Sequence, residues 1–425
     1  MKKDTYKLTP FFYIGEATFE YFISLLITST FLAKLTTHLG FSDSLTAILS
    51  SFVALGCSFQ LFSIAFFKTG RVKKRVTLMH IINQLLFMGI YLVPFTPFQS
   101  MGAKTFLFIV FLLGGYFISN VIHAPKINWF MSIVDDNKRG IFTSVKEMVS
   151  LIGGFAFNII MGTIIDNYEA AGNIRGAFTI CAATIFILML LHTLTLVLSK
   201  EKEPKQVSKD TTVAKRFEAI IKDKNIMKVI FVSIFWTIST HVCTPFFGTY
   251  QVKELGFSMQ YVAALSILSS LTRIPCSFIL GRYADKTSFA RMLKICFALA
   301  GVAFLFAAFT VPANGKVFYA IYTMLYGAAM GGINSAQINL IFDYVNPYQR
   351  SDALAIKQTI YGICGFVATL VFTPLFNYIQ GTGNNIFGMH IYPQQLLSAV
   401  AFVLTILLII YIDKIILRIK TQKDE

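Results

Sequence analysis

Residues 175–198 read RGAFTICAATIFILMLLHTLTLVL, an almost wholly apolar run whose one charged residue, Arg175, stands at its start. A helix rises about 1.5 Å per residue, so roughly 20 apolar residues cross a hydrocarbon core about 30 Å thick. Lipid offers the backbone no hydrogen-bond partners, so a spanning segment of this kind is expected to be helical. The stretch therefore predicts a transmembrane helix.

The same pattern recurs along the whole chain of 425 residues. Hydrophobic residues make up 55% of the chain and charged residues 14%, whereas a soluble globular chain carries roughly 25% charged residues. We therefore predict an all-α polytopic membrane protein with about twelve transmembrane helices. The predicted spans are residues 10–34, 43–67, 76–96, 104–134, 141–166, 175–198, 226–250, 257–281, 291–311, 316–343, 352–379 and 391–416.

Lysine and arginine are distributed unevenly among the segments that connect the spans. With the N-terminus inside, the inner segments hold most of these cations, including those of the polar stretch 199–228 and of the C-terminal tail. By the positive-inside rule, this asymmetry predicts cytoplasmic N- and C-termini in a cell membrane, which we take to be a bacterial cytoplasmic membrane. The outer segments hold only Lys34, Lys104, Arg175, Lys253 and Lys316.

The net charge of +16 follows from the same asymmetry. Attraction of the inner cations to an anionic inner leaflet accounts for it, so we expect a lipid bilayer as partner and no nucleic acid. The charged N-terminus leads into a first span that is too long for a signal-peptide core, so we expect an uncleaved helix.

The sequence lacks the motifs of hydrolytic and metal chemistry. It contains no G-x-x-x-x-G-K-S/T phosphate loop, no H-E-x-x-H and no G-x-S-x-G. Its six cysteines all lie in predicted spans without metal-ligand spacing, which is typical of small buried apolar residues. We expect no enzyme activity, no cofactor and no metal site, and without a phosphate loop the chain is not expected to be driven by ATP on its own.

The most polar stretch divides six spans from six spans. We predict an N-terminal half over residues 1–198, a cytoplasmic linker over 199–228 and a C-terminal half over 229–425. Within the linker, four apolar residues fall on one helical face among lysines, which indicates a short helix on the inner membrane surface or a solvated linker helix. These residues are Val213, Phe217, Ile220 and Ile221.

The two halves resemble each other in sequence. Four matched pairs recur at one constant offset without a gap. Such an internal repeat in a membrane transporter places a substrate site between the halves near the middle of the membrane. The pairs are Ile127-Asn128 with Ile338-Asn339, Arg139 with Arg350, Lys146 with Lys357, and Gly154-Phe155 with Gly365-Phe366.

Residues 281–286 read GRYADK, and Arg291 follows them. This stretch resembles the signature loop of the major facilitator superfamily, in which a glycine is followed by an aspartate and several basic residues. The matching stretch of the first half, residues 67–75 (FKTGRVKKR), keeps the basic residues and lacks the aspartate. The resemblance implies two six-helix halves that work by alternating access. No subfamily is assignable, because the sugar-porter motifs P-E-S-P-R and P-E-T-K-G are absent, as is a G-P pair in the fifth span.

The signature loop is expected to act as a gate. Its acidic residue can cap a neighbouring helix N-terminus while the basic residues face phosphate head groups. The alternative is a plain solvated turn. The predicted gating residues are Gly281, Asp285, Lys286 and Arg291, with Arg139 and Arg350 at the matched positions of the two halves.

Three charged side chains stand inside predicted spans of the first half. Glu16 and Glu20 are four residues apart and so share one helical face, and Lys126 lies at a comparable depth. The superfamily resemblance implies that their spans both line the central cavity. We predict that Glu16, Glu20 and Lys126 form the proton-coupling group, the alternative being a static buried salt bridge.

Polar side chains recur at matched depths of the two halves. His123, Lys126 and Asn128 correspond to Asn334, Gln337 and Asn339. Amides both donate and accept hydrogen bonds, which suits a polyhydroxylated or zwitterionic solute, although hydrogen bonds between helices are the alternative. The predicted substrate-binding residues are Glu20, Asn120, His123, Lys126, Asn128, Trp236, His241, Asn334, Gln337, Asn339, Gln358 and Tyr361.

These features predict a monomeric secondary transporter. We expect it to move a small hydrophilic, sugar-like solute, coupled to a proton or other ion gradient. An efflux antiporter for amphipathic compounds is one alternative, favoured by the 43 phenylalanines. A non-transporting membrane sensor is another, although no large soluble domain is predicted.

Overall fold

The computed structural model describes residues 6, 8–67, 71–134, 139–202, 213–345, 350–386 and 388–419. The chain divides into two compact units. The first contains residues 1–207 and 257–263, and the second contains residues 208–256 and 264–425.

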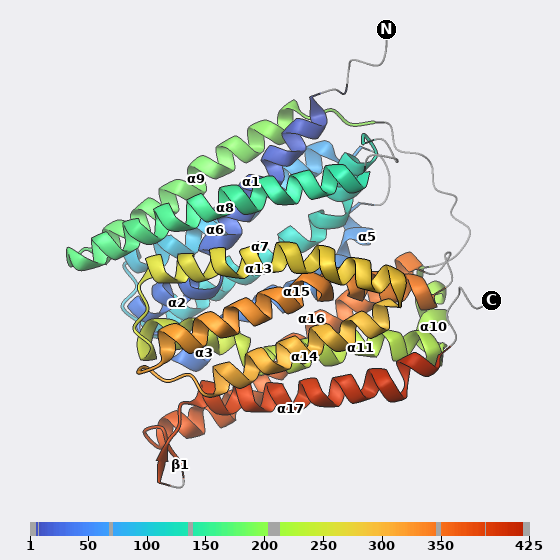
Figure 1. The fold of residues 1–425 in the computed structure, drawn as a ribbon. Coiled ribbons are helices and arrows are strands. Elements are labelled where there is room, and N and C mark those ends of the chain that lie inside the picture. The colour runs from blue at the N-terminus through green and yellow to red at the C-terminus, as the bar shows by residue number, and fades with distance from the viewer. Residues whose placement is uncertain are drawn as a thin grey trace. The chain divides into compact units, whose positions relative to one another are not determined.

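Helices dominate both units (Figure 1). Those before the linker are α1 (Thr9–Leu26), α2 (Ser29–His38), α3 (Asp43–Ser50), α4 (Phe52–Ser58), η2 (Phe59–Phe62), α5 (Ser63–Phe66), α6 (Lys73–Leu92), η3 (Val93–Phe95), α7 (Met101–Met131), α8 (Arg139–Ala170) and α9 (Ile174–Leu198). The later elements are α10 (Val213–Lys222), α11 (Lys224–His241), η5 (Thr244–Phe246), α12 (Phe247–Thr249), η6 (Tyr250–Glu254), α13 (Met259–Lys286), α14 (Phe289–Ala308), α15 (Gly315–Tyr344), α16 (Arg350–Gly381), the antiparallel strands β1 (Asn385–Ile386) and β2 (Met389–His390), α17 (Pro393–Lys414) and η7 (Ile416–Arg418).

The predicted all-α polytopic fold is confirmed. Within the described residues, 10 helices are long and apolar enough to cross a membrane, or 11 if the pair α1 and α2, bent by 42°, is one span. Helix α15 is 30 residues long and is not among them, because its tyrosines, glycines and amides lower its mean hydropathy.

Some predicted spans are broken helices. Residues 43–67 form α3, α4, η2 and α5 in succession rather than one helix. In the span predicted over 226–250, α11 ends at His241, and Pro245 stands in the first turn of η5. Proline lacks the N–H that would continue the preceding helix, so the break follows from the sequence.

The predicted linker helix is present as α10. Ile220 is fully buried in the second unit, whereas Ile221 is exposed, so these two do not share one buried face. Val213 and Phe217 belong to α10, but their side chains lie outside the described residues. The six cysteines are free thiols, each buried or half-buried.

An aromatic cluster fixes one end of the first unit. The ring of Tyr13 on α1 stacks on Phe130 of α7 at 4.2 Å, and Trp129 stacks on Phe130 at 4.5 Å. The indole N–H of Trp129 donates to the backbone oxygen of Lys200 at 2.9 Å. These contacts hold α1 against α7 one turn away from the charged side chains that both helices carry.

The start of the linker also caps α6. The carboxylate of Glu201 accepts hydrogen bonds from the backbone N–H groups of Val72 and Lys73, at 2.6 and 3.2 Å. The Nζ of Lys73 in turn donates to the backbone oxygens of Val197 and Ser199, both at 2.7 Å. A carboxylate at a helix N-terminus and an ammonium at a C-terminus each oppose the charge of the helix end, so this exchange ties α6 to α9.

Two glycines let α15 approach α13 closely in the second unit. A Cβ added at Gly327 would lie 2.6 Å from the backbone oxygen of Ser269, and one at Gly331 would lie 2.7 Å from that of Arg273. The two are four residues apart and so lie on one face, which is the small-residue pattern of close helix packing in membranes.

Gly331→Ala is expected to lower the free energy of unfolding by about 1–3 kcal/mol, because backbone blocks the added methyl group and α15 must move away. The helix propensity of alanine offsets up to about 1 kcal/mol of this loss. Gly381→Ala, at the end of α16 with open space around the added Cβ, is the matched control. Thermal unfolding of the purified variants measures both, and equal melting temperatures would contradict this packing.

Candidate functional site

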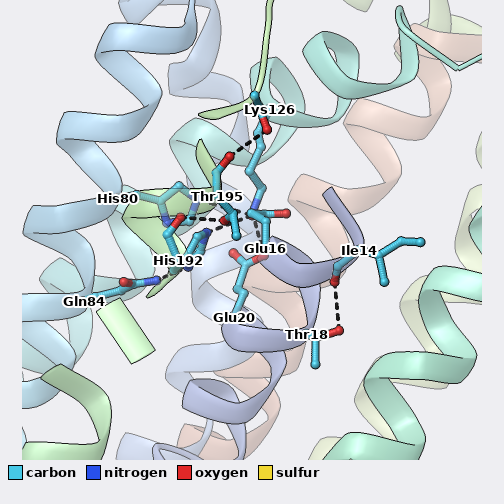
Figure 2. A network of polar contacts seen from close by, with 10 residues as sticks. Ile14, Glu16, Thr18, Glu20, His80, Gln84, Lys126, His192 and Thr195 are labelled. Atoms are coloured by element: carbon cyan, nitrogen blue, oxygen red, sulfur yellow. Dashed lines mark hydrogen bonds and ion pairs between the residues drawn. The ribbon is translucent and has the colours of Figure 1, made fainter. Parts of the chain in front are cut away.

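A buried group of polar side chains lies between α1, α6, α7 and α9 of the first unit (Figure 2). We call it the charge cluster; it consists of Glu16, Glu20, His80, Gln84, Lys126 and His192. Five of these residues are at most 2% exposed, namely Glu16, His80, Gln84, Lys126 and His192. The Glu20 side chain is 34% exposed, which makes it the least buried part of the cluster.

One ammonium is shared by two carboxylates. The Nζ of Lys126 lies 2.6 Å from Oε1 of Glu16 and 2.5 Å from Oε2 of Glu20. The spacing of four on α1 aims both carboxylates at α7, as the sequence predicts. The structure thus brings together the three residues predicted to couple protons, and their role in coupling stays a prediction.

The formal charges of the cluster do not cancel. Two carboxylates and one ammonium sum to −1 when both imidazoles are neutral. A buried charge that no opposite charge compensates lowers the stability of the folded protein. The cluster therefore has room for one further positive charge.

Two histidines stand on the other side of Glu16. Nε2 of His192 lies 3.0 Å from Oε1 of Glu16, and Nδ1 of His192 forms a hydrogen bond with the side-chain amide of Gln84. Nε2 of His80 lies 3.9 Å from the same Oε1, and the two imidazole rings are 4.5 Å apart. Among the described residues, Glu16, His80 and His192 are the group whose donor atoms lie close enough together to hold a metal ion.

The sequence predictions do not include His80 or His192. A signal for both exists, since each is an ionisable residue inside an apolar span. Their meeting with Glu16 could not be predicted, because the three side chains come from three helices and their separations in sequence carry no spacing pattern.

The other predicted substrate-binding residues of the first unit lie along α7. His123 and Asn128 are exposed, whereas Lys126 between them is buried in the charge cluster. Asn120 is half-buried, and its side-chain amide donates to the backbone oxygen of Tyr116 at 2.9 Å. His123 and Asn128 are therefore the exposed members of this set on α7, and their contact with a solute stays a prediction.

The predicted substrate-binding residues of the second unit differ in exposure. Asn334 is exposed, and Gln337, Asn339, Gln358 and Tyr361 are half-buried. They lie on α15 and α16, and their contact with a solute stays a prediction.

Two predicted binding residues on α11 are engaged in contacts within the second unit. Trp236 is 2% exposed and stacks on Phe297 at 4.9 Å, so little of its ring is open to a solute. The Nδ1 of His241 lies 3.0 Å from the backbone oxygen of Thr237, and its ring meets that of Tyr361 edge-on at 6.5 Å.

The predicted gating loop is shorter than expected. Residues 281–286 form the last turns of α13, and α14 begins at Phe289. The cap of α14 comes from Ser288, whose side chain accepts a hydrogen bond from the backbone N–H of Arg291 at 3.2 Å, and not from Asp285. Gly281 is half-buried, while Asp285, Lys286 and Arg291 are exposed on the surface.

The two matched arginines stand at the starts of long helices. Arg350 begins α16, and its Nε donates to the backbone oxygen of Val345 at 3.1 Å. Arg139 begins α8, but its side chain lies outside the described residues.

Solved structures of transporters resemble the whole chain. A mutant of the nucleoside transporter NupG aligns with a TM-score of 0.71 and 15% identity, over 95% of this chain and 99% of that one. A bacterial homologue of the iron transporter ferroportin aligns at 0.67 and 10%, over 97% and 99% of the two chains. A D-xylose-proton symporter aligns at 0.63 and 15%, over 94% and 96%. At these identities the likeness shows the fold alone.

No curated protein sequence matches this chain. At the level of sequence families, residues 15–369 match the Major Facilitator Superfamily. The match covers well over half of the chain and agrees with the fold of the solved transporters. The chain therefore belongs to the Major Facilitator Superfamily, a family of membrane transporters.

Proposed function

We propose that the chain is a proton-coupled secondary transporter of a small hydrophilic solute. The observation that supports coupling is the lysine shared between a fully buried and a partly exposed carboxylate. A static pair would need one carboxylate only. The second carboxylate gives the ammonium of Lys126 two partners. Protonation of one carboxylate can therefore shift the ammonium to the other.

Glu20 is the proposed proton acceptor. Its side chain is 34% exposed, whereas Glu16 is fully buried. When Glu20 takes up a proton, its attraction for Lys126 falls and the ammonium rests on Glu16 alone. When the proton leaves, the shared arrangement returns. Conformations that differ in access to Glu20 would thereby differ in stability, which is what linkage between a proton and alternating access requires.

The solute class is proposed from the amides. Asn128 and Asn334 are exposed, and Gln337 and Asn339 are half-buried. Such groups both donate and accept hydrogen bonds, as hydroxyl-rich solutes require. Two of the solved structures are a nucleoside transporter and a D-xylose-proton symporter. Nucleosides and pentoses are accordingly the first solutes to test.

The orientation and the gate complete the proposal. We infer cytoplasmic termini in a bacterial cytoplasmic membrane, which labelling of single cysteines by an impermeant reagent tests. Asp285 at the end of α13 is proposed to act in the gate and not in solute binding. Asp285→Asn should then lower the maximal transport rate more than the solute affinity.

Accumulation by proteoliposomes tests the function. Purified protein is reconstituted, an inward proton gradient is imposed, and uptake of labelled nucleosides and pentoses is followed with and without a protonophore. Accumulation above the outside concentration that the protonophore abolishes is the expected result. Uptake that only equilibrates would overturn coupling, and expulsion of amphipathic compounds would support the efflux alternative.

A further inference from the structure

We propose that Glu16, His80 and His192 form a binding site for a divalent transition-metal ion of the zinc class. The three donor atoms come from α1, α6 and α9 and all lie within 4.8 Å of one another. The site goes beyond the proposed transport function and is independent of the solute.

The donor set suits such an ion. Two imidazole nitrogens and one carboxylate oxygen are ligands that Zn²⁺, Co²⁺ and Fe²⁺ accept. In a tetrahedral zinc site with bonds of about 2.0–2.1 Å, neighbouring donors lie roughly 3.3 Å apart. The separations from Oε1 of Glu16 are 3.0 Å to His192 and 3.9 Å to His80. Small side-chain rotations therefore bring all three donors to coordination distance.

Three buried polar atoms of the proposed ligands lack hydrogen-bond partners. Both ring nitrogens of His80 and Oε2 of Glu16 are buried and make no hydrogen bond within the described part of the chain. Buried polar atoms are rarely left without a partner, so these three atoms call for an explanation. A cation held by both carboxylate oxygens of Glu16 would satisfy Oε2 and one nitrogen of His80 together.

Gln84 orients one of the proposed ligands. Its side-chain amide forms a hydrogen bond with Nδ1 of His192, which turns Nε2 toward Glu16. When the amide is turned by 180°, its oxygen accepts the Nδ1–H. A metal-bound histidine usually donates its second N–H in this way, and Gln84 supplies that contact.

Lys126 is the competitor of the ion. Its ammonium lies 2.6 Å from Oε1 of Glu16, so a dication beside Glu16 would repel it. Glu20 gives the ammonium a second carboxylate at 2.5 Å, with which it can stay paired when the ion binds Glu16. The ion and the pair between Lys126 and Glu16 should therefore exclude each other. The competition predicts that replacing Lys126 increases the affinity for the ion. A purely structural role of these residues would not increase it.

Cobalt binding to the purified, tag-free protein tests the site. Chelator-treated protein is titrated with Co²⁺, and the visible absorption of the bound ion and its stoichiometry are measured; Zn²⁺ should displace the signal. We expect one Co²⁺ per chain. His80→Asn and His192→Asn should weaken binding about 100-fold or more, since each removes a ligand. His390→Asn, at an exposed position on β2, is the matched control and should bind as the unmodified protein does.

Lys126→Met provides the second arm. Removing the competing ammonium should tighten Co²⁺ binding about tenfold or more. Size-exclusion profiles and circular dichroism show whether each variant is folded. His80→Gln replaces His80→Asn, and Lys126→Gln replaces Lys126→Met, if the first variant is not folded. Absence of stoichiometric binding, or a cobalt spectrum unchanged by loss of His80, would overturn the site. Weaker binding in Lys126→Met would overturn the competition. None of these measurements uses a solute or a gradient, so they can fail or succeed independently of proton-coupled transport.

Discussion

Glu20→Gln is expected to abolish uphill accumulation of the solute while leaving exchange of solute across the membrane largely intact. Glutamine keeps the size and one hydrogen-bond acceptor for Lys126 but cannot take up or release a proton. During exchange, the transporter carries solute in both directions and no net movement of protons is needed. Net accumulation does need net movement of protons. Uptake in proteoliposomes under an imposed proton gradient, compared with counterflow in the same vesicles, separates the two.

Glu218→Gln is the control for this variant, because Glu218 forms an exposed pair with Lys222 on α10 far from the cluster in sequence. It should accumulate solute as the unmodified protein does. Uphill, pH-dependent accumulation by Glu20→Gln at the normal rate would show that Glu20 does not carry the proton. If Glu16→Gln also accumulates solute uphill at the normal rate, Glu16, Glu20 and Lys126 have a structural role only.

Lys126→Met is expected to be among the most destabilising single substitutions in the first unit. It leaves two carboxylates, one of them fully buried, without their ammonium. Removing one partner of a buried ion pair typically costs about 3–5 kcal/mol, because the remaining buried charge has lost its counter-ion. Thermal and denaturant-induced unfolding of the purified protein measure the loss.

A double substitution tests the cause of that loss. Glu16→Gln combined with Lys126→Met removes the buried charge and its partner together, so it should recover much of the stability that Lys126→Met alone loses. Lys294→Met, which breaks the more exposed pair with Asp413, is the matched control and should cost far less. If the double variant loses as much free energy of unfolding as the two single variants lose together, the ion pair contributes little and the loss comes from packing.

The membrane-spanning helices were largely predictable, because their signal is local. Long apolar runs such as residues 175–198 mark spans whatever their neighbours are. The spacing of Glu16 and Glu20 and the depth of Lys126 are also readable along one chain, and the superfamily resemblance supplies the expectation that their two spans face the same cavity.

The features that the sequence did not predict depend on contacts between helices. His80 and His192 meet Glu16 only because α6 and α9 pack beside α1. Trp236 was predicted to meet a solute, yet Phe297 covers its ring. The continuation of α13 through residues 281–286 was also unexpected, because glycine and a polar run usually indicate a turn, whereas here the helix ends only at Lys286.

The most direct test of proton-coupled transport is the movement of protons that the solute itself induces. Proteoliposomes are loaded with a pH-sensitive dye at equal pH inside and outside, and a transported nucleoside or pentose is added outside. Symport predicts acidification of the lumen with the unmodified protein and none with Glu20→Gln. Solute entry at a normal rate without any change of lumenal pH would contradict the account.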